Sequence, residues 1–229
     1  MAHHPPPQWD AANGLLVARF RHGPLWNFSY LIADEATGEA TVIDPAWDAA
    51  GIVAAAVARG LRITTVLLTH SHSDHANGVA EVAAATGARV FVHAADAAGL
   101  EAHFGHATTF AGREEFALGP QAVVARPTPG HTAGSVTYSV DGRLFTGDTL
   151  AIGSPGTPGP ERGSLERLWE STALLGGEER DTIIHPGHDA GPEAFAALEV
   201  EVTRNPALLA NSLEAFRAAV ERATGRAHH

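Results

Sequence analysis

Residues 63–78 read ITTVLLTHSHSDHANG, and this stretch joins an apolar run to a cluster of ligating side chains. The run at 63–69 is rich in β-branched residues and is typical of a fully buried strand. Four polar residues follow it directly: His70, His72, Asp74 and His75. Imidazole and carboxylate groups suit zinc, iron or manganese. The stretch therefore predicts a metal site at the end of a buried strand.

The composition limits the class of protein. The chain has 229 residues, 45% of them hydrophobic, so it can bury one large core. Its formal net charge is −11 and it contains no lysine, which argues against nucleic acid and anionic membranes as partners. Without cysteine, any metal site has to use histidine and carboxylate ligands. The chain has no apolar leader and no apolar run near 18 residues, so we expect a cytoplasmic protein with a small-molecule substrate. Homo-oligomerisation is left open.

Short apolar runs bounded by turn residues predict alternating strands and helices. In the first half we expect strands near 14–20, 27–33, 40–45, 63–69 and 88–94, and helices at 47–60 and 76–87. In the second half we expect strands near 115–119, 121–128, 135–140, 143–148 and 182–188, and a helix at 164–175. Asp141-Gly142 favours a tight hairpin. This order predicts an α/β fold of two similar halves, packed sheet against sheet with helices outside.

Apolar residues recur at helical spacing in the C-terminal tail. Leu209, Leu213, Phe216 and Val220 fall on one face, which we expect to end at Gly225. We expect a single domain over residues 1–229, with a core at about 13–190 and a short helical tail at 192–225.

Three more ligand-type residues have the same placement as the first cluster. His131 follows a Pro-Gly turn, and Asp148 and His188 each follow the end of a β-type run. Each lies beside a glycine, which lets backbone and ligand approach closely. The five histidines and two aspartates are enough for two metal ions that share a carboxylate.

Taken in order, HSHSDH, the TPGH turn, TGD and the final PGH resemble the metallo-β-lactamase superfamily, over roughly residues 13–190. This resemblance implies a four-layer αββα sandwich with the metals at one edge, between the sheets. By motif position it implies that Asp148 bridges two metal ions. It also implies the other ligands, which are His70, His72 and His131 for one ion and Asp74, His75 and His188 for the other.

The resemblance also implies a metal-dependent hydrolase. Water on such metals has its pKa lowered from about 15.7 to about 7, so hydroxide is available at neutral pH to attack a carbonyl. Asp74 is the expected catalytic residue, because it ligates and is placed to orient the nucleophile. The expected cofactors are two divalent ions, zinc or else iron or manganese.

Two branches of the superfamily are the most similar. The DEATGEATVIDPA hairpin, TGDTL and the RNPALL segment resemble both the hydroxyacylglutathione hydrolases (glyoxalase II) and the persulfide dioxygenases. The first are dinuclear thioester hydrolases. The second use one Fe(II), which by motif position would be held here by His70, His131 and Asp148. A third alternative is a structural metal site in a protein that acts through association, against which the complete set of seven ligands argues.

The chain departs from both branches after TGD. Those families carry a Gly-Cys-Gly-Arg turn there, whereas this chain has IGSPGTPGP and its nearest arginine is Arg162. Whether glutathione is recognised is therefore left open. Arg162, Arg204 and Arg217 are candidates for binding a substrate carboxylate or phosphate, although arginines are more often solvated surface.

Other residues have weaker assignments. Trp26, Phe28 and Tyr30 are candidates for lining a pocket near the metals, or are plain core and surface residues. His185 is a candidate for holding a ligand imidazole by a hydrogen bond. For the remaining internal histidines we expect a structural role; these are His93, His103 and His106.

Overall fold

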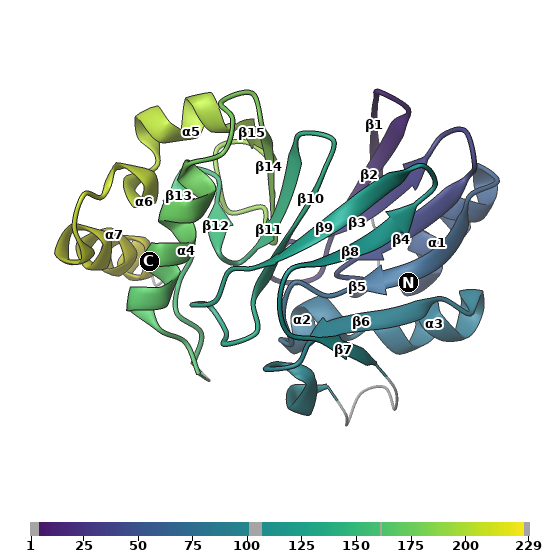
Figure 1. Cartoon of the computed structure of the whole chain (residues 1–229), viewed down its shortest axis with the longest axis horizontal. Coiled ribbons are helices and arrows are strands. Elements are labelled where there is room, and N and C mark those ends of the chain that lie inside the picture. Colours follow the sequence, from purple (N-terminus) through teal and green to yellow (C-terminus); the bar gives the residue numbers. More distant parts are fainter. Residues whose placement is uncertain (1–4, 101–106, 161, 227–229) are drawn as a thin grey trace.

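The computed structural model describes residues 5–100, 107–160 and 162–226 and contains two main β-sheets (Figure 1). The first sheet has its strands in chain order: β1 (Gln8–Ala12), β2 (Leu15–His22), β3 (Asn27–Asp34), β4 (Glu39–Ile43), β5 (Arg62–Leu67), β6 (Arg89–His93) and β7 (Thr108–Phe110). Strands β1 to β4 are antiparallel, and β4 to β7 are parallel neighbours.

The second sheet has the order β15-β14-β11-β10-β9-β8. Its strands are β8 (Glu114–Leu118), β9 (Gln121–Pro127), β10 (Val136–Val140), β11 (Arg143–Gly147), β14 (Ile183–Pro186) and β15 (Ala196–Ala197). A separate small pair is formed by β12 (Leu150–Ala151) and β13 (Ser154–Pro155). Asp141 and Gly142 both have positive φ, as a two-residue hairpin turn of type I′ requires, so the hairpin prediction is confirmed.

Helices cover the outer faces of both sheets (Figure 1). On the first sheet these are α1 (Ala49–Ala58) and α3 (Val79–Thr86). On the second they are α4 (Leu165–Gly176), α5 (Leu198–Arg204), α6 (Pro206–Leu209) and α7 (Leu213–Arg226). The two sheets enclose a core of aromatic and aliphatic residues, including Phe28, Tyr30 and Phe145. The four-layer αββα sandwich is confirmed.

Local signals explain most helix boundaries. Asp48 caps α1 by accepting a hydrogen bond from the Gly51 N–H, and Ser164 caps α4 in the same way. In the tail, Phe216 and Val220 are buried as predicted. Two tail predictions were wrong, because Leu209 ends α6 with an exposed side chain, and α7 continues to Arg226 beyond Gly225.

Several short elements were not predicted from the sequence. They are β1, β7, the β12–β13 pair, β15, the one-turn helix α2 (Ser73–Ala76) and the 3₁₀ turn η1 (Ala97–Gly99). Most have two to five residues, too few for a periodic pattern to show. The prediction of a single domain with a short tail stays a prediction. Among the described residues, no helix has the length and apolar character that crossing a bilayer requires.

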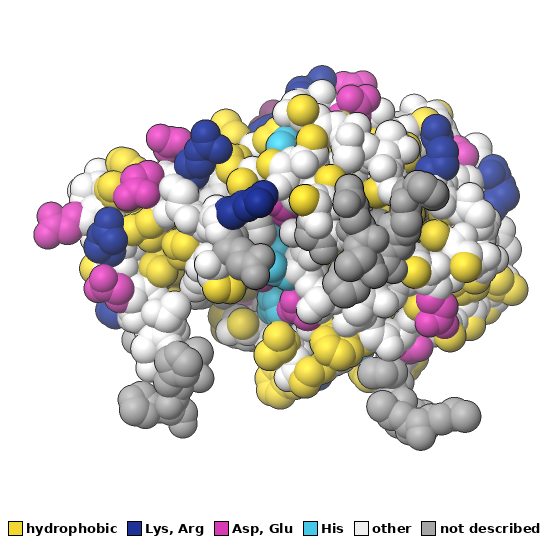
Figure 2. All heavy atoms as spheres, turned by 90° about the horizontal axis from the view of Figure 1, so that it is seen from below, with side chains coloured by type: hydrophobic (Ala, Val, Ile, Leu, Met, Phe, Trp, Pro, Cys, Tyr) yellow, Lys and Arg dark blue, Asp and Glu magenta, His cyan; other side chains and the backbone are white. Residues whose placement is uncertain are grey.

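The predicted ligands all come after the ends of strands. The loop after β5 carries the HSHSDH motif, His131 follows β9, Asp148 follows β11 and His188 follows β14. Strands β11 and β14 are parallel, so their carboxyl ends lie at the same edge of the sheet. Viewed onto that edge, Figure 2 shows histidine side chains in the middle of a hollowed face.

Candidate metal centre

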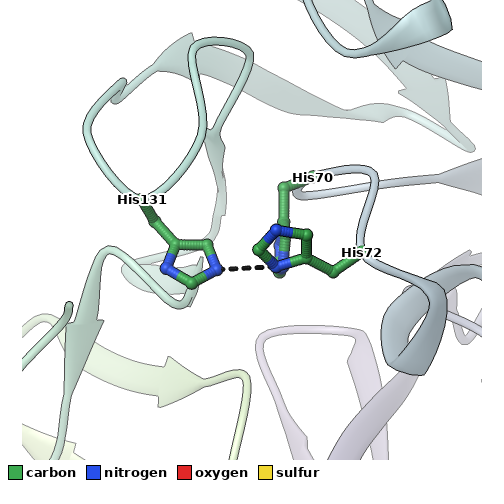
Figure 3. A group of neighbouring side chains, drawn as sticks. All are labelled: His70, His72 and His131. Atoms are coloured by element: carbon green, nitrogen blue, oxygen red, sulfur yellow. Dashed lines mark hydrogen bonds between the residues drawn. The ribbon is translucent and has the colours of Figure 1, made fainter. Parts of the chain in front are cut away.

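Three imidazoles meet in the first part of the site (Figure 3). The Nδ1 atom of His72 lies 3.1 Å from Nε2 of His70 and 2.9 Å from Nε2 of His131. His70 and His131 are buried, whereas His72 is partly exposed. The β5 loop and the loop between β9 and β10 therefore direct three ring nitrogens at one point.

A second group lies next to the first. Nε2 of His75 is 3.1 Å from Nε2 of His188, and Oδ2 of Asp74 is 3.5 Å from the same His188 atom. The ring centroid of His75 is 4.2 Å from that of His70, so the two groups adjoin. These three side chains converge like the first three.

Asp148 lies between the two groups. Its Oδ2 atom is 3.4 Å from Nε2 of His131 in the first group and 3.3 Å from Nε2 of His188 in the second. A Cβ atom at Gly187 would lie 2.3 Å from Oδ1 of Asp148, so glycine there makes room for the carboxylate. The geometry is that of a group shared by two sites.

Hydrogen bonds fix which nitrogen of several rings is free. Nδ1–H of His131 donates to the Thr157 carbonyl at 2.6 Å, and Nδ1–H of His188 donates to the Leu25 carbonyl at 3.0 Å. The opposite nitrogen, Nε2, faces the site and is the atom that a metal ion would bind. Backbone carbonyls and carboxylates that hold ligand imidazoles in this way are a regular feature of metal sites.

Asp44 supports the centre and was missed by the sequence reasoning. Its buried carboxylate accepts hydrogen bonds from the Thr69 N–H, the Thr69 hydroxyl and Nδ1–H of His75. Thr69 Oγ1 in turn lies 3.0 Å from Nδ1 of His70. One carboxylate therefore orients imidazoles of both groups. The available signal was its position, because Asp44 follows the end of β4 just as Asp148 follows β11.

Asp96 and Asn27 are two further supporting residues that the sequence did not reveal. The Asp96 carboxylate accepts from the Ser71 N–H, the Thr132 hydroxyl and the Gly134 N–H, which ties the β5 loop to the His131 loop. Asn27 donates from Nδ2 to Oδ2 of Asp74 at 2.9 Å. The role of each residue depends on contacts with distant parts of the chain. No short motif around either residue therefore reveals it.

The donor set fits divalent metal ions. Two nitrogens bound to the same zinc ion, each at about 2.0–2.1 Å, lie roughly 3 Å apart. The ring nitrogens of each group have this spacing. With Nδ1 of His131 and His188 engaged by backbone carbonyls, Nε2 of each ring faces the cluster and can ligate a cation there. The described residues fit two adjacent ions, with Asp148 able to contact both.

The electrostatics of the first group also favour a metal. Burial lowers the pKa of His70 and of His72, so both rings are neutral at pH 7, as ligation requires. Burial raises the pKa of Asp148, but the neighbouring His75 and His188 outweigh it and hold that pKa well below its usual range. Asp148 is therefore ionised.

The second group has a surplus of negative charge. Burial lowers the pKa of His75, but Asp148 and the hydrogen-bonded Asp44 outweigh burial and raise it to about 9. Asp148 likewise overcomes burial to raise the pKa of His188. Protons held so firmly mark a position that attracts positive charge, and a metal ion there has to displace them.

Two of the sequence-predicted arginines lie in ion pairs outside the centre. Arg204 pairs with Glu193 and Glu201, and Arg217 lies 3.7 Å from Glu166. Arg162 differs, because it lines a cavity of about 220 Å³ that also touches His72 and Asp96.

Of the three aromatic candidates, two lie in the core and one is exposed beside the centre. Phe28 and Tyr30 are in the core between the sheets, so for these two residues the structure agrees with the core alternative. Trp26 has 55% of its surface exposed and lies between Leu25, which holds His188, and Asn27, which holds Asp74. Of the other histidines, His93 bonds the Ala111 carbonyl, and His103 and His106 lie outside the described residues.

The structure does not support the candidate role of His185, which was to hold a ligand imidazole. Its ring stacks on Phe145 and Phe195 and meets the edge of Tyr30. Among the described residues neither ring nitrogen has a hydrogen-bond partner. Side chains alternate along β14, so His185 points into the core between the sheets and does not reach a ligand imidazole.

We predict that His185→Phe makes the protein less sensitive to acid. Burial, with Arg19 and Arg143, lowers the pKa of His185 to about 3 in the folded state, whereas the unfolded residue titrates near its ordinary 6.5. Between these values only the unfolded chain takes up the proton, so stability falls as pH drops, by at most about 1.4 kcal/mol per pH unit.

Urea unfolding at pH 7 and pH 5 checks this prediction. The variant should lose less stability between the two pH values than the unsubstituted protein, because the phenyl ring keeps the stacking and binds no proton. Equal losses in both proteins would contradict it.

Comparisons with known proteins agree with this geometry. The family model described as the metallo-beta-lactamase superfamily matches residues 23–188. The hydroxyacylglutathione hydrolase of Anaeromyxobacter dehalogenans is 42% identical over 181 residues, which cover 76% of this chain and 66% of that protein. The hydroxyacylglutathione hydrolase of Fuscovulum blasticum is 39% identical over 80% of this chain and 70% of that protein. The chain thus spans about two thirds of the length of these relatives.

A solved structure adds a comparison of the whole fold. The crystal structure of ETHE1 from Myxococcus xanthus superposes with a TM-score of 0.78 at 27% identity, and covers 90% of this chain and 89% of that one. The family match contains the motif residues from His70 to His188. By this match, and by its four-layer fold, the chain belongs to the metallo-beta-lactamase superfamily.

Proposed function

We propose that this protein is a hydrolase that uses two divalent metal ions to cleave a thioester, or a related small acyl ester or lactone. The observation that carries the proposal is the convergence of two ligand groups on Asp148, whose Oδ2 lies 3.4 Å from His131 and 3.3 Å from His188. The likeness to hydroxyacylglutathione hydrolases supports a thioester as the reacting bond. Zinc is the expected metal, with iron and manganese as alternatives. A cytoplasmic location stays a prediction.

In this proposal the ligands divide as the motif positions imply. One ion would be held by His70, His72 and His131 and the other by Asp74, His75 and His188, with Asp148 as the ligand that they would share. When bound, such ions supply Lewis acidity and a water that ionises near neutral pH.

The chain's own residues orient the reactants. Asn27 holds one carboxylate oxygen of Asp74 at 2.9 Å and is itself fixed by the indole N–H of Trp47. We assign Asp74 to accept a proton from the attacking water and to hold that water toward the carbonyl carbon. Asp44 keeps the His75 imidazole in one tautomer throughout.

The alternative is a mononuclear iron enzyme of the persulfide dioxygenase type. It would use His70, His131 and Asp148 and would leave positions free for oxygen. Two observations favour the dinuclear hydrolase. Nδ1 of His72 converges with Nε2 of His70 and Nε2 of His131. Asp74, His75 and His188 form a second cluster of three ligand atoms.

A panel of thioesters, esters and lactones tests the proposal. Thiol release should be measured with the unsubstituted protein and with Asp74→Ala, for which we expect a fall in kcat/KM of about 10²- to 10³-fold. The control Asp181→Ala removes an exposed carboxylate outside the site and should leave the rate unchanged. Full hydrolytic activity after complete removal of metal would overturn the proposal.

A further inference from the structure

A pocket of about 300 Å³ opens beside Asp148 and His188. Its walls come from four parts of the chain: the end of β11, the segment after β14, the β12–β13 pair with the two residues after it, and the end of α7. Gly156, Ala223 and Thr224 are among the other lining residues. A substrate whose reacting bond lies at the metal ligands can therefore extend into this pocket.

Apart from Asp148 and His188, the lining residues carry no ionisable side chain. A Cβ atom at Gly156 would lie 2.1 Å from the Asp148 carbonyl oxygen, so a side chain cannot project from that position. The hydroxyl of Thr224 is engaged within its own helix, where it donates to the carbonyls of Val220 and Glu221. The pocket thus offers mainly apolar contacts.

The pocket wall contains no arginine among the described residues. Arg204 is held by Glu193 and Glu201. Arg222 does not line the pocket itself but lines an adjoining cavity, which shares Ser154, Pro155, Ala190 and Ala223 with it. Arg162 lines the cavity beside His72. The chain has no lysine. Among the described residues, no cationic side chain other than His188 lines the pocket between α7 and Asp148.

We propose that this pocket receives an uncharged, largely apolar part of the substrate, so that the protein acts on thioesters of an uncharged thiol in preference to those of glutathione. The inference rests on the proposed function and names its substrate class. Within the described part of the chain, a carboxylate placed here would lose its hydration without gaining an arginine or lysine partner from the pocket wall. Apolar pockets with few polar groups favour neutral groups of matching size.

Binding of two non-hydrolysable thioethers tests this inference independently of turnover. The probes are N-acetyl-S-propylcysteamine, which is uncharged, and S-propylglutathione, which carries two carboxylates and one ammonium group. Both share the S-propyl group. Titration calorimetry with the full metal-loaded chain should give a Kd at least about tenfold lower for the uncharged probe.

Two variants of α7 locate the binding site. Ala223→Arg places a cation in the pocket wall and should weaken binding of the uncharged probe about fivefold or more. In the same variant, the difference in Kd between the uncharged probe and S-propylglutathione should shrink or change sign. Ala218→Arg adds the same charge to the same helix at a position that does not line the pocket, and should leave both affinities unchanged.

Each outcome bears on the inference. It is overturned if S-propylglutathione binds the unsubstituted protein as tightly as the uncharged probe, if neither probe binds, or if Ala223→Arg changes neither affinity. Tight binding of the uncharged probe without hydrolysis of any thioester would instead overturn the proposed function, and would leave standing only the assignment of the pocket to an uncharged group.

Discussion

Asp148→Asn should lower kcat/KM for thioester hydrolysis by about 10³-fold, because Oδ2 of Asp148 lies 3.4 Å from His131 in one ligand group and 3.3 Å from His188 in the other. The amide keeps the shape of the side chain but removes a negative charge between two cations. We also expect fewer than two metal ions per chain. Steady-state kinetics and elemental analysis of the same preparation measure both effects.

The control for this prediction is Asp181→Asn, which changes the net charge equally at an exposed position away from the site. Its activity and metal content should match those of the unsubstituted protein. If Asp148→Asn kept two ions and full activity, Asp148 could not be a shared ligand, and the division of ligands proposed above would be wrong.

Asp96→Ala should lower the free energy of unfolding by about 3 kcal/mol. The carboxylate is buried and accepts from the Ser71 N–H, the Thr132 hydroxyl and the Gly134 N–H. Alanine leaves these three donors without their acceptor, at a cost of about 1–3 kcal/mol for each donor that water does not reach. Urea unfolding followed by circular dichroism measures the loss.

A matched control separates this effect from the general loss of an aspartate. Asp48 accepts a single hydrogen bond, from the Gly51 N–H at the start of α1, so Asp48→Ala should cost only about 1 kcal/mol. Asp96→Ala should also weaken metal binding, because Asp96 ties the loop that carries His72 to the loop that carries His131. Equal stability losses in the two variants would contradict the role given to Asp96.

Much of the fold could be predicted because its signals are local. The apolar run before His70, the Asp141-Gly142 turn and the amphipathic segment around Phe216 each predict an element without knowledge of the rest of the chain. The seven candidate ligands could be found for a similar reason. Each follows a strand end beside turn residues, and strand ends in this fold gather at one edge.

What the sequence could not provide depends on long-range contacts. Asp96 and Asn27 act on segments 25 and 47 residues away, and nothing near them in the chain marks that role. The error at His185 has the opposite cause. Its spacing of three from His188 suggested proximity, but the alternation of side chains along β14 turns it into the core, where Phe145 stacks against it.

The most direct test of the central claim, that two metal ions share Asp148 in one hydrolytic site, is the metal content of active protein. Elemental analysis of protein expressed without added metal should give two equivalents of zinc, iron or manganese per chain, in a preparation that hydrolyses a thioester. One equivalent of iron, in a preparation that consumes oxygen with a persulfide and leaves thioesters intact, would contradict the claim.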